Sequence, residues 1–349
     1  MKRRDVILAA WILAAWLCLG MGSAGWALDT VKTTSSTVTG QVVKMTRQQV
    51  DVERSGVVRN LPANEVVYIH YSDEPSLLRT ARGHVQAGRY NDALEALNKV
   101  PPGDLTRAEM TQDLAYYRAL ASARLALGGG AALADARDQM RTFVHGNINS
   151  YHFYEGCEVL GNLYAAMGDY ANAEKYYAQL ETSPWPDYQM RGGVAIGRAR
   201  LAQGKAAEAR QSFAKVLAIE ATGDAAQSQR LAAQLGEAAC QVAEGKHDEA
   251  IQAVEGIIAN ANPEDVDLCA RAYNILGSAH RKAGRDQEAL LAFLHVDILY
   301  FAVPETHAEA LASLAVLWEA VHKPQRAAEA RQVLQERYKN SPWAKQGGS

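Results

Sequence analysis

Residues 160–177 read LGNLYAAMGDYANAEKYY, and this stretch decides the fold. It contains Gly161, then the turn residue Gly168, and then Ala173 followed four residues later by Tyr177. Glycine is suited to ending a helix because it adopts left-handed backbone angles without a steric penalty. A small residue such as Ala173 lets two helix backbones approach where they cross, and a bulky residue one turn later fills the space beside the crossing. The stretch therefore predicts two helices packed as a hairpin.

The same phrase, a glycine followed five residues later by an alanine, recurs along the chain. It occurs at Gly88–Ala93, Gly168–Ala173, Gly204–Ala209, Gly245–Ala250 and Gly284–Ala289, with a weaker copy at His322–Ala327 and a degenerate one near Gly130–Ala136. From Ala173 onward the alanines are 36, 41, 39 and 38 residues apart. Such a period is typical of helical repeats, in which each hairpin buries its apolar face against its neighbours.

A small residue in the first helix, a glycine turn, and an alanine with a bulky plug in the second helix together resemble the tetratricopeptide repeat. The resemblance covers roughly residues 77–345. It implies a mainly α fold, a tetratricopeptide-like solenoid of about seven helical hairpins over residues 75–345, with a short tail at 346–349. The spacing exceeds the usual ~34 residues, which predicts longer helices or loops. HEAT-like repeats are the alternative, but the Gly-x-x-x-x-Ala phrase argues against them.

Residues 28–74 have a different texture. Val42-Val43 and Val66–Ile69 are rich in β-branched residues, and Gln49–Glu53 alternates apolar with polar side chains. These short strand signals predict a small β-barrel-like module that resembles SH3 or Sm-like barrels. Its role stays open between a cap on the end of the helical array and a docking piece.

Three helix starts carry capping signals. Thr106 is followed three residues later by Glu109, in the pattern of a capping box. Thr306 is followed three residues later by Glu309, which is the spacing of a capping box. Asn262 precedes Pro263, which predicts an N-cap with proline at the first helical position.

The N-terminus indicates a targeting segment. Lys2, Arg3 and Arg4 precede an uncharged stretch over residues 6–28, and small residues end it. We expect residues 1–27 to be a signal peptide, which predicts a periplasmic or otherwise exported protein of the bacterial cell envelope. The alternative is an uncleaved anchor in the inner membrane through residues 6–28, which are long enough to cross a bilayer.

Composition narrows the classes of partner. The chain is 48% hydrophobic and 21% charged, so it can bury a core, and its net charge is −3. This mildly acidic balance provides no electrostatic basis for binding nucleic acid, and we expect membrane contact only if the anchor is uncleaved. Beyond residue 27 the cysteines are Cys157, Cys240 and Cys269. A Cys240–Cys269 disulfide and three separately buried cysteines are both compatible with this spacing.

Motifs for chemistry are missing from the sequence. We find no His-Glu-x-x-His, no Gly-x-Ser-x-Gly and no phosphate loop, so we expect no catalytic residues, no cofactor and no metal. Gly128-Gly129-Gly130 continues into Ala131-Ala132, with no Lys or hydroxyl residue to hold a phosphate. It therefore predicts a helix break.

A polar face offers candidate binding residues. Arg271, Asn274, Ser278 and Arg281 are spaced by 3, 4 and 3 residues and so share one helix face. Arg191 and Arg198 occupy the equivalent face two repeats earlier, and Asn162 lies on it in the third repeat. The resemblance implies that this face lines a concave groove. Arginines and amides there suit the carboxylate or backbone groups of an extended peptide, although an ordinary solvated face stays an open alternative.

Aromatic residues are concentrated in the third repeat and its exit. They are Tyr151, Phe153, Tyr154, Tyr164, Tyr176, Tyr177, Trp185 and Tyr188. They indicate either a peptide-binding hot spot or an inter-repeat core.

These observations favour an exported, non-catalytic scaffold or adaptor that binds a partner protein or peptide in its groove. One alternative is a self-associating structural component of an envelope assembly, which would be a homo-oligomer. The other is an enzyme or ligand-binding protein with an unrecognised site.

Overall fold

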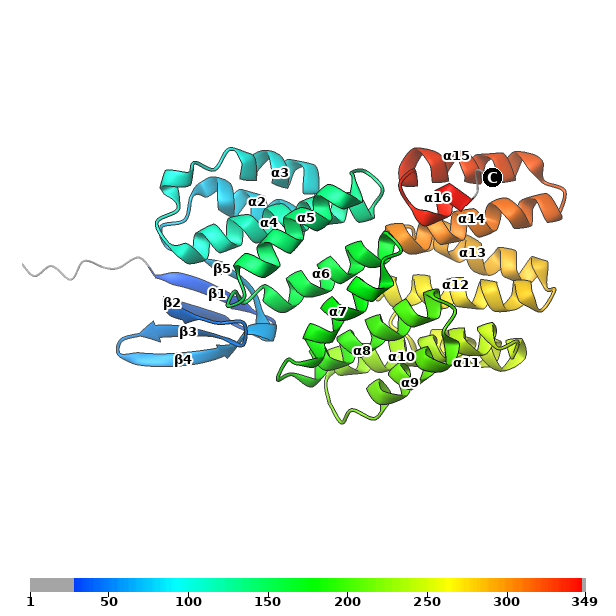
Figure 1. Cartoon of the computed structure of the whole chain (residues 1–349), viewed down its shortest axis with the longest axis horizontal. Helices are drawn as coiled ribbons and strands as arrows, with labels where there is room; N and C mark the ends of the chain where they lie inside the picture. Colours follow the sequence, from blue (N-terminus) through cyan, green and yellow to red (C-terminus); the bar gives the residue numbers. More distant parts are fainter. Residues whose placement is uncertain (1–27, 347–349) are drawn as a thin grey trace, which may run out of the picture.

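The computed structural model describes residues 28–346, which form an N-terminal antiparallel sheet followed by fifteen helices, α2 to α16 (Figure 1). The predicted mainly α solenoid behind a small β module is therefore confirmed. The expected signal peptide at residues 1–27 lies outside the described residues, as does most of the expected tail.

The sheet is a bent, five-stranded module. Its strands are β1 (Asp29–Thr33), β2 (Thr37–Met45), β3 (Gln49–Arg54), β4 (Val57–Pro62) and β5 (Val66–His70), in the order β4-β3-β2-β1-β5. The first half of β2 pairs with β1 and its second half pairs with β3, and a register shift lies between Val42 and Lys44. Such an irregularity bends a strand, which lets the sheet curl over its apolar face. The described strand ladders do not join β4 to β5, so the expected barrel is a curled sheet that these ladders leave open.

The helices form seven hairpins and a terminal helix. The hairpins are α2 (Ser76–Gln86) with α3 (Tyr90–Asn98), α4 (Ala108–Leu127) with α5 (Leu133–Gly146), α6 (Phe153–Ala166) with α7 (Tyr170–Glu181), α8 (Pro186–Ala202) with α9 (Ala206–Leu217), α10 (Asp224–Ala243) with α11 (His247–Asn260), α12 (Val266–Lys282) with α13 (Asp286–Leu299), and α14 (Pro304–Ala320) with α15 (Pro324–Tyr338); α16 (Pro342–Gln346) follows. Several first helices have 17 or 20 residues, which accounts for the long repeat period.

The repeated phrase has the structural role that its residues predict. The turn glycines adopt left-handed angles, for example φ 77° at Gly168 and φ 74° at Gly284. The alanines at the helix crossing, including Ala173 and Ala289, are fully buried. A Cβ atom at Gly277 would lie 2.7 Å from the Phe293 ring, so the glycine leaves the space that the plug of the same hairpin fills.

The three capping predictions were wrong. Thr106 lies before Arg107, which is the N-cap residue of α4, and its hydroxyl donates a hydrogen bond to the Asp73 carboxylate at 2.5 Å. Asp265 caps α12 by accepting a hydrogen bond from the Leu268 backbone N–H at 3.2 Å, whereas Asn262 accepts one from the Glu264 N–H in the preceding turn. Thr306 lies inside α14 because this helix begins at Pro304, and the Thr306 hydroxyl donates to the Val303 carbonyl. Proline at the first helical position, with its preset φ, starts the helix earlier than the threonine would.

One hydrophobic cluster joins the sheet to the first hairpins. It includes Val31 and Val50 of the sheet together with Leu78 of α2 and Met110 of α4. Asp29 is 1% exposed; it forms a salt bridge with Arg107 at 2.8 Å and accepts hydrogen bonds from the Val42 and Ser72 backbone N–H groups. The β module is therefore fixed along the first hairpins by both apolar packing and a buried carboxylate.

The solenoid closes on itself. The Asn340 side chain donates hydrogen bonds to the carbonyls of Gly129 and Ala131, both at 3.2 Å, although these residues are more than 200 positions apart. The turn between α4 and α5 thus lies beside the end of α15, and the helices between them form a ring (Figure 1).

Cys157, Cys240 and Cys269 are buried and unpaired, so the Cys240–Cys269 disulfide is absent from the structure. Within residues 28–346, every helix is too short or too polar to span a bilayer.

Candidate functional site on the concave face

The first helices of the later hairpins bring charged side chains together on the inner side of the ring, which we call the concave face. Arg198 of α8 lies close enough to Asp267 and Arg271 of α12, and to Glu305 of α14, for their charges to shift its pKa. Arg124 of α4 likewise acts on Asp267. Four helices from separate repeats therefore face one another across the ring.

Arg271 is held by two carboxylates. Its guanidinium is 3.0 Å from Asp267 on its own helix and 3.5 Å from Glu305 of the next hairpin. Burial acts against its charge, but Asp267 and Glu305 outweigh burial and raise the pKa of Arg271. Asp267 and Glu305 stay half or more exposed, so water reaches this cluster.

Asn274 is engaged in packing rather than free for a partner. It is 2% exposed, and its amide donates to the Thr306 carbonyl at 2.9 Å and to the Glu309 carboxyl at 3.1 Å. This residue fastens α12 to α14, which sequence spacing alone did not reveal.

Arg191 and Asn162 also have partners within the chain. Arg191 forms a salt bridge with Glu158 of α6 and lies over the Tyr188 ring, 4.6 Å from its centroid. Asn162 accepts a hydrogen bond from the Tyr177 hydroxyl at 2.8 Å. Both residues are half-buried, so they present only part of their polar surface to the ring interior.

Arg198 differs from these neighbours. It is half-buried and forms no salt bridge with any residue between 28 and 346. Burial, together with the positive charge of Arg271, lowers the pKa of the Arg198 guanidinium to about 10. The other two predicted residues, Ser278 and Arg281, are half-buried and exposed respectively. Among the half-buried arginines of this face, which are Arg191, Arg198 and Arg271, Arg198 is thus the one without a salt bridge within residues 28–346.

Two acidic residues of the concave face were missed by the sequence reasoning. Glu305 and Glu309 are four residues apart on α14 and face Arg271 and Asn274. Burial and the charge of Glu305 raise the pKa of the Glu309 carboxyl to about 7. Glu309 precedes Ala315 by six residues, as Arg271 precedes Gly277, so comparing equivalent repeat positions would have found it.

The aromatic residues of the third repeat belong to the core. Seven of the eight, from Tyr151 to Tyr188, are less than 9% exposed, and Trp185 packs partly buried against the same cluster. The inter-repeat core is therefore the supported interpretation of this group.

A second set of charges lies buried beneath the sheet. Arg82 of α2 is 1% exposed and contacts Glu74 at 2.9 Å and Asp113 of α4 at 3.2 Å, while His152 lies 3.3 Å from Asp113. Burial opposes the charge of His152, but the nearby carboxylates of Asp113 and Glu155 raise its pKa. These groups fix the register of α2, α4 and α6, because a buried charge is tolerated only beside its partners.

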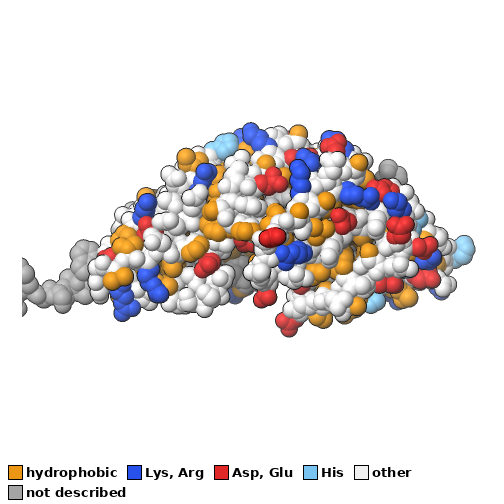
Figure 2. All heavy atoms as spheres, turned by 90° about the horizontal axis from the view of Figure 1, so that it is seen from below, with side chains coloured by type: hydrophobic (Ala, Val, Ile, Leu, Met, Phe, Trp, Pro, Cys, Tyr) orange, Lys and Arg blue, Asp and Glu red, His pale blue; other side chains and the backbone are white. Residues whose placement is uncertain are grey.

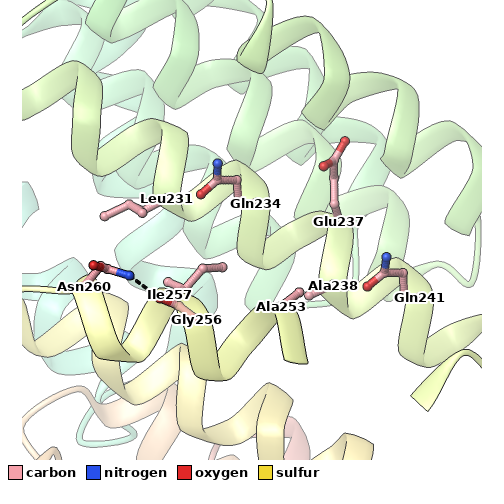
Figure 3. Close-up of a pocket in the computed structure, with 9 residues that line it drawn as sticks. All are labelled: Leu231, Gln234, Glu237, Ala238, Gln241, Ala253, Gly256, Ile257 and Asn260. Carbon is pink, nitrogen blue, oxygen red and sulfur yellow. Dashed lines mark hydrogen bonds between the residues drawn. The ribbon is translucent and has the colours of Figure 1, made fainter. Parts of the chain in front are cut away.

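A shallow pocket lies between α10 and α11. Gln234, Glu237 and Gln241 line one side, and the small residues Ala253 and Gly256 leave space on the other (Figure 3).

Over the face in Figure 2, acidic and basic side chains are interspersed without a large patch of one sign. In the part of the chain that the structure describes, no three His, Cys, Asp or Glu side chains are arranged to hold a metal ion.

Comparison with known proteins agrees with this architecture. A family model described as tetratricopeptide repeat matches residues 157–187. No curated protein matches the sequence.

Several solved structures share the fold at low sequence identity. A tetratricopeptide repeat protein from Parabacteroides merdae has 17% identity and a TM-score of 0.52, with 78% of this chain and 98% of that chain covered. A Rap protein complexed with Competence and Sporulation Factor has 13% identity and a TM-score of 0.52, covering 77% and 76%. The apo form of the quorum sensor NprR from B. thuringiensis has 16% identity and a TM-score of 0.53, covering 74% of each chain.

Proposed function

We propose that this tetratricopeptide solenoid, a fold of protein-interaction adaptors that is typically non-catalytic, binds an extended segment of a partner protein on its concave face. The observation that carries the proposal is Arg198, a half-buried cation without a salt bridge among residues 28–346, whereas the half-buried Arg191 and Arg271 each have one.

The chemistry of Arg198 favours an anionic group on the partner. A carboxylate of the bound segment would form the salt bridge that Asp267 and Glu305 do not form with Arg198, and it would relieve the repulsion from Arg271. The half-buried Asn162 of α6 and Ser278 of α12 carry polar atoms that suit the backbone of an extended chain. The pairs Arg191–Glu158 and Arg271–Asp267 hold the remaining charges in place, so the surface is ordered before the partner binds.

A pull-down with charge variants tests this proposal. Crosslinked residues 28–349 should recover one dominant partner from the organism's own envelope fraction, and Arg198→Met should reduce the affinity at least about tenfold. Hydrogen bonds to a charged group contribute about 1.5–3 kcal/mol, which sets this magnitude. Lys215→Glu, an exposed charge change on α9, is the control. Equal recovery by wild type and Arg198→Met would remove Arg198 from the binding site.

We further propose that the adaptor works outside the cytoplasm. This rests on the basic residues 2–4 and the uncharged stretch at 6–28. Mass determination of the chain isolated from the envelope fraction should find a new N-terminus near residue 28. A full-length chain in the membrane would favour the anchor, and a full-length chain in the cytosol would contradict export.

A second candidate function is self-association through α13. The side chains of Leu291 and Ile298 are 59% and 62% exposed, and because they lie seven residues apart they share one helix face. Leu299, which is 60% exposed, and Phe301, which follows the helix and is 53% exposed, extend this apolar surface. The second helix of the preceding hairpin, α11, exposes the polar Gln252 and the small Ala259 at the two equivalent positions. An exposed apolar face of this kind favours contact with a second copy of the chain.

Light scattering decides this second candidate. A dimer should form in the wild type and dissociate in Leu291→Glu/Ile298→Glu, because two buried charges would oppose the contact. A wild type that stays monomeric at high concentration contradicts self-association and leaves the adaptor proposal in place.

A further inference from the structure

The ring is closed by a small contact between distant segments. On one side is the turn Gly128–Ala131 between α4 and α5, and on the other is the segment Arg337–Asn340 at the end of α15. Gly129 has φ 82°, and a Cβ atom there would lie 2.8 Å from the Tyr338 Cα and 2.9 Å from the Arg337 carbonyl oxygen. The glycine run that sequence analysis assigned to a helix break therefore also serves close backbone contact.

The closing segment is held firmly on its own side. Tyr338 is 7% exposed, and its hydroxyl lies 2.7 Å from His307 Nδ1, while His307 Nε2 lies 2.8 Å from Asp297. This network anchors the end of α15 to α13 and α14. The segment therefore moves with its own repeat and not with the α4–α5 turn.

The contact across the ring is polar and narrow. The hydrogen bonds described across this contact are the two that the Asn340 amide donates to the carbonyls of Gly129 and Ala131. The apolar residues beside the α4–α5 turn belong to one hydrophobic cluster, and those beside the end of α15 belong to another. Between these two lie further separate clusters in α8–α10 and α10–α13. In a solenoid, repeats contact mainly their neighbours, and the array bends by small shifts between such clusters. Because no shared hydrophobic cluster supports the contact between the α4–α5 turn and the end of α15, we expect the ring to open there first.

The contact also lies over the candidate site. Arg124, one helical turn before Gly128, acts electrostatically on Asp267, and Pro304 at the start of α14 is the neighbour that a Cβ at Gly128 would meet at 3.8 Å. Glu305 and Glu309 follow directly on α14.

We infer that the Gly128–Ala131 turn and the Arg337–Asn340 segment form a latch that opens to admit an extended segment of a partner to the concave face. The occupant is an extended segment that carries a carboxylate, because Arg198 is a half-buried cation without a salt bridge among residues 28–346. The choice of occupant rests on the proposed adaptor function, whereas the latch itself rests on the geometry alone.

Solution scattering tests the latch without any partner. Asn340→Ala removes both hydrogen bonds across the ring, and the radius of gyration should increase. The matched control is Asn260→Ala, which removes a local bond from that amide to the Gly256 carbonyl at 2.8 Å on an exposed part of α11. Identical scattering from the two variants would overturn the latch.

A locked ring tests its role in binding. Ala131→Cys/Asn340→Cys should form a disulfide on mild oxidation, with Ala131→Cys alone as the control, because the three native cysteines of the described chain are buried. The oxidised ring should lose the partner that the reduced ring recovers, and a reducing agent should restore it. Full recovery by the oxidised ring would overturn the gating role. If no form recovers a partner, the adaptor proposal fails, and scattering alone judges the latch.

Discussion

At the scale of single residues, the fold depends on glycines that face aromatic plugs. Gly277 lies inside α12, and its missing side chain makes room for Phe293, which is 2% exposed. Gly277→Ala should lower the free energy of unfolding by about 1–3 kcal/mol, because an added methyl overpacks a ring that cannot move. Denaturant unfolding measures the change.

Gly83→Ala provides the matched control. Gly83 lies inside α2 with open space around it, so alanine there should raise stability by about 0.5–1 kcal/mol through helix propensity. Equal effects of the two variants would show that backbone preference, rather than the plug, governs these positions.

Glu309 should make stability depend on pH. Its pKa rises from 4.5 in the free side chain to about 7 in the folded chain, so the folded state binds the extra proton between these values. Its contribution therefore lowers the free energy of unfolding as pH rises through this window. Glu309→Gln should be more stable than wild type above pH 7, by on the order of 1–2 kcal/mol, and should match it near pH 4. Glu255→Gln, an exposed change on α11, should show no such pH dependence.

At the scale of elements, the sheet and the first hairpins form one unit. Asp29 on β1 joins them through Arg107, which precedes α4, and through two backbone N–H groups. Asp29→Ala should lower stability by about 2–3 kcal/mol, because it removes a buried carboxylate and leaves its donors unpaired. Calorimetry should still show the sheet and α2–α6 unfolding together, since they share a core.

The control for this contact uses the other carboxylate on the same arginine. Asp73 lies 3.1 Å from Arg107 but is 43% exposed. Asp73→Ala should change stability by about 0.5 kcal/mol or less, as exposed ion pairs do. A loss as large as that of Asp29→Ala would refute the importance of burial here.

At the scale of the whole molecule, separate hydrophobic clusters should give separate stabilities. Leu314 of α14 is 1% exposed in the C-terminal cluster. Leu314→Ala should cost about 2–4 kcal/mol locally, and hydrogen exchange should rise in α12–α16 while β1–α5 stay protected. Leu78→Ala, in the N-terminal cluster, should give the reverse pattern. A uniform rise in both variants would indicate that the ring unfolds as one unit.

The sequence by itself determined the repeat architecture of this protein. Each hairpin is specified by residues that act within it, such as the turn glycine Gly168, the crossing alanine Ala173 and the bulky Phe293. Their local spacing was therefore sufficient to predict seven hairpins. The β module before them was predicted from its β-branched and alternating residues. Sequence spacing also placed Arg198 and Arg271 on one face, because helix periodicity decides which side chains share a surface.

Only the tertiary structure decided which of those side chains are free. Asn274 is bonded to Thr306 and Glu309, and Arg271 to Asp267 and Glu305, whereas Arg198 forms no salt bridge within residues 28–346. The closure of Asn340 onto Gly129 is likewise absent from any repeat pattern. These contacts join residues from different repeats, and their geometry depends on small rotations accumulated over several hairpins, which local sequence does not encode.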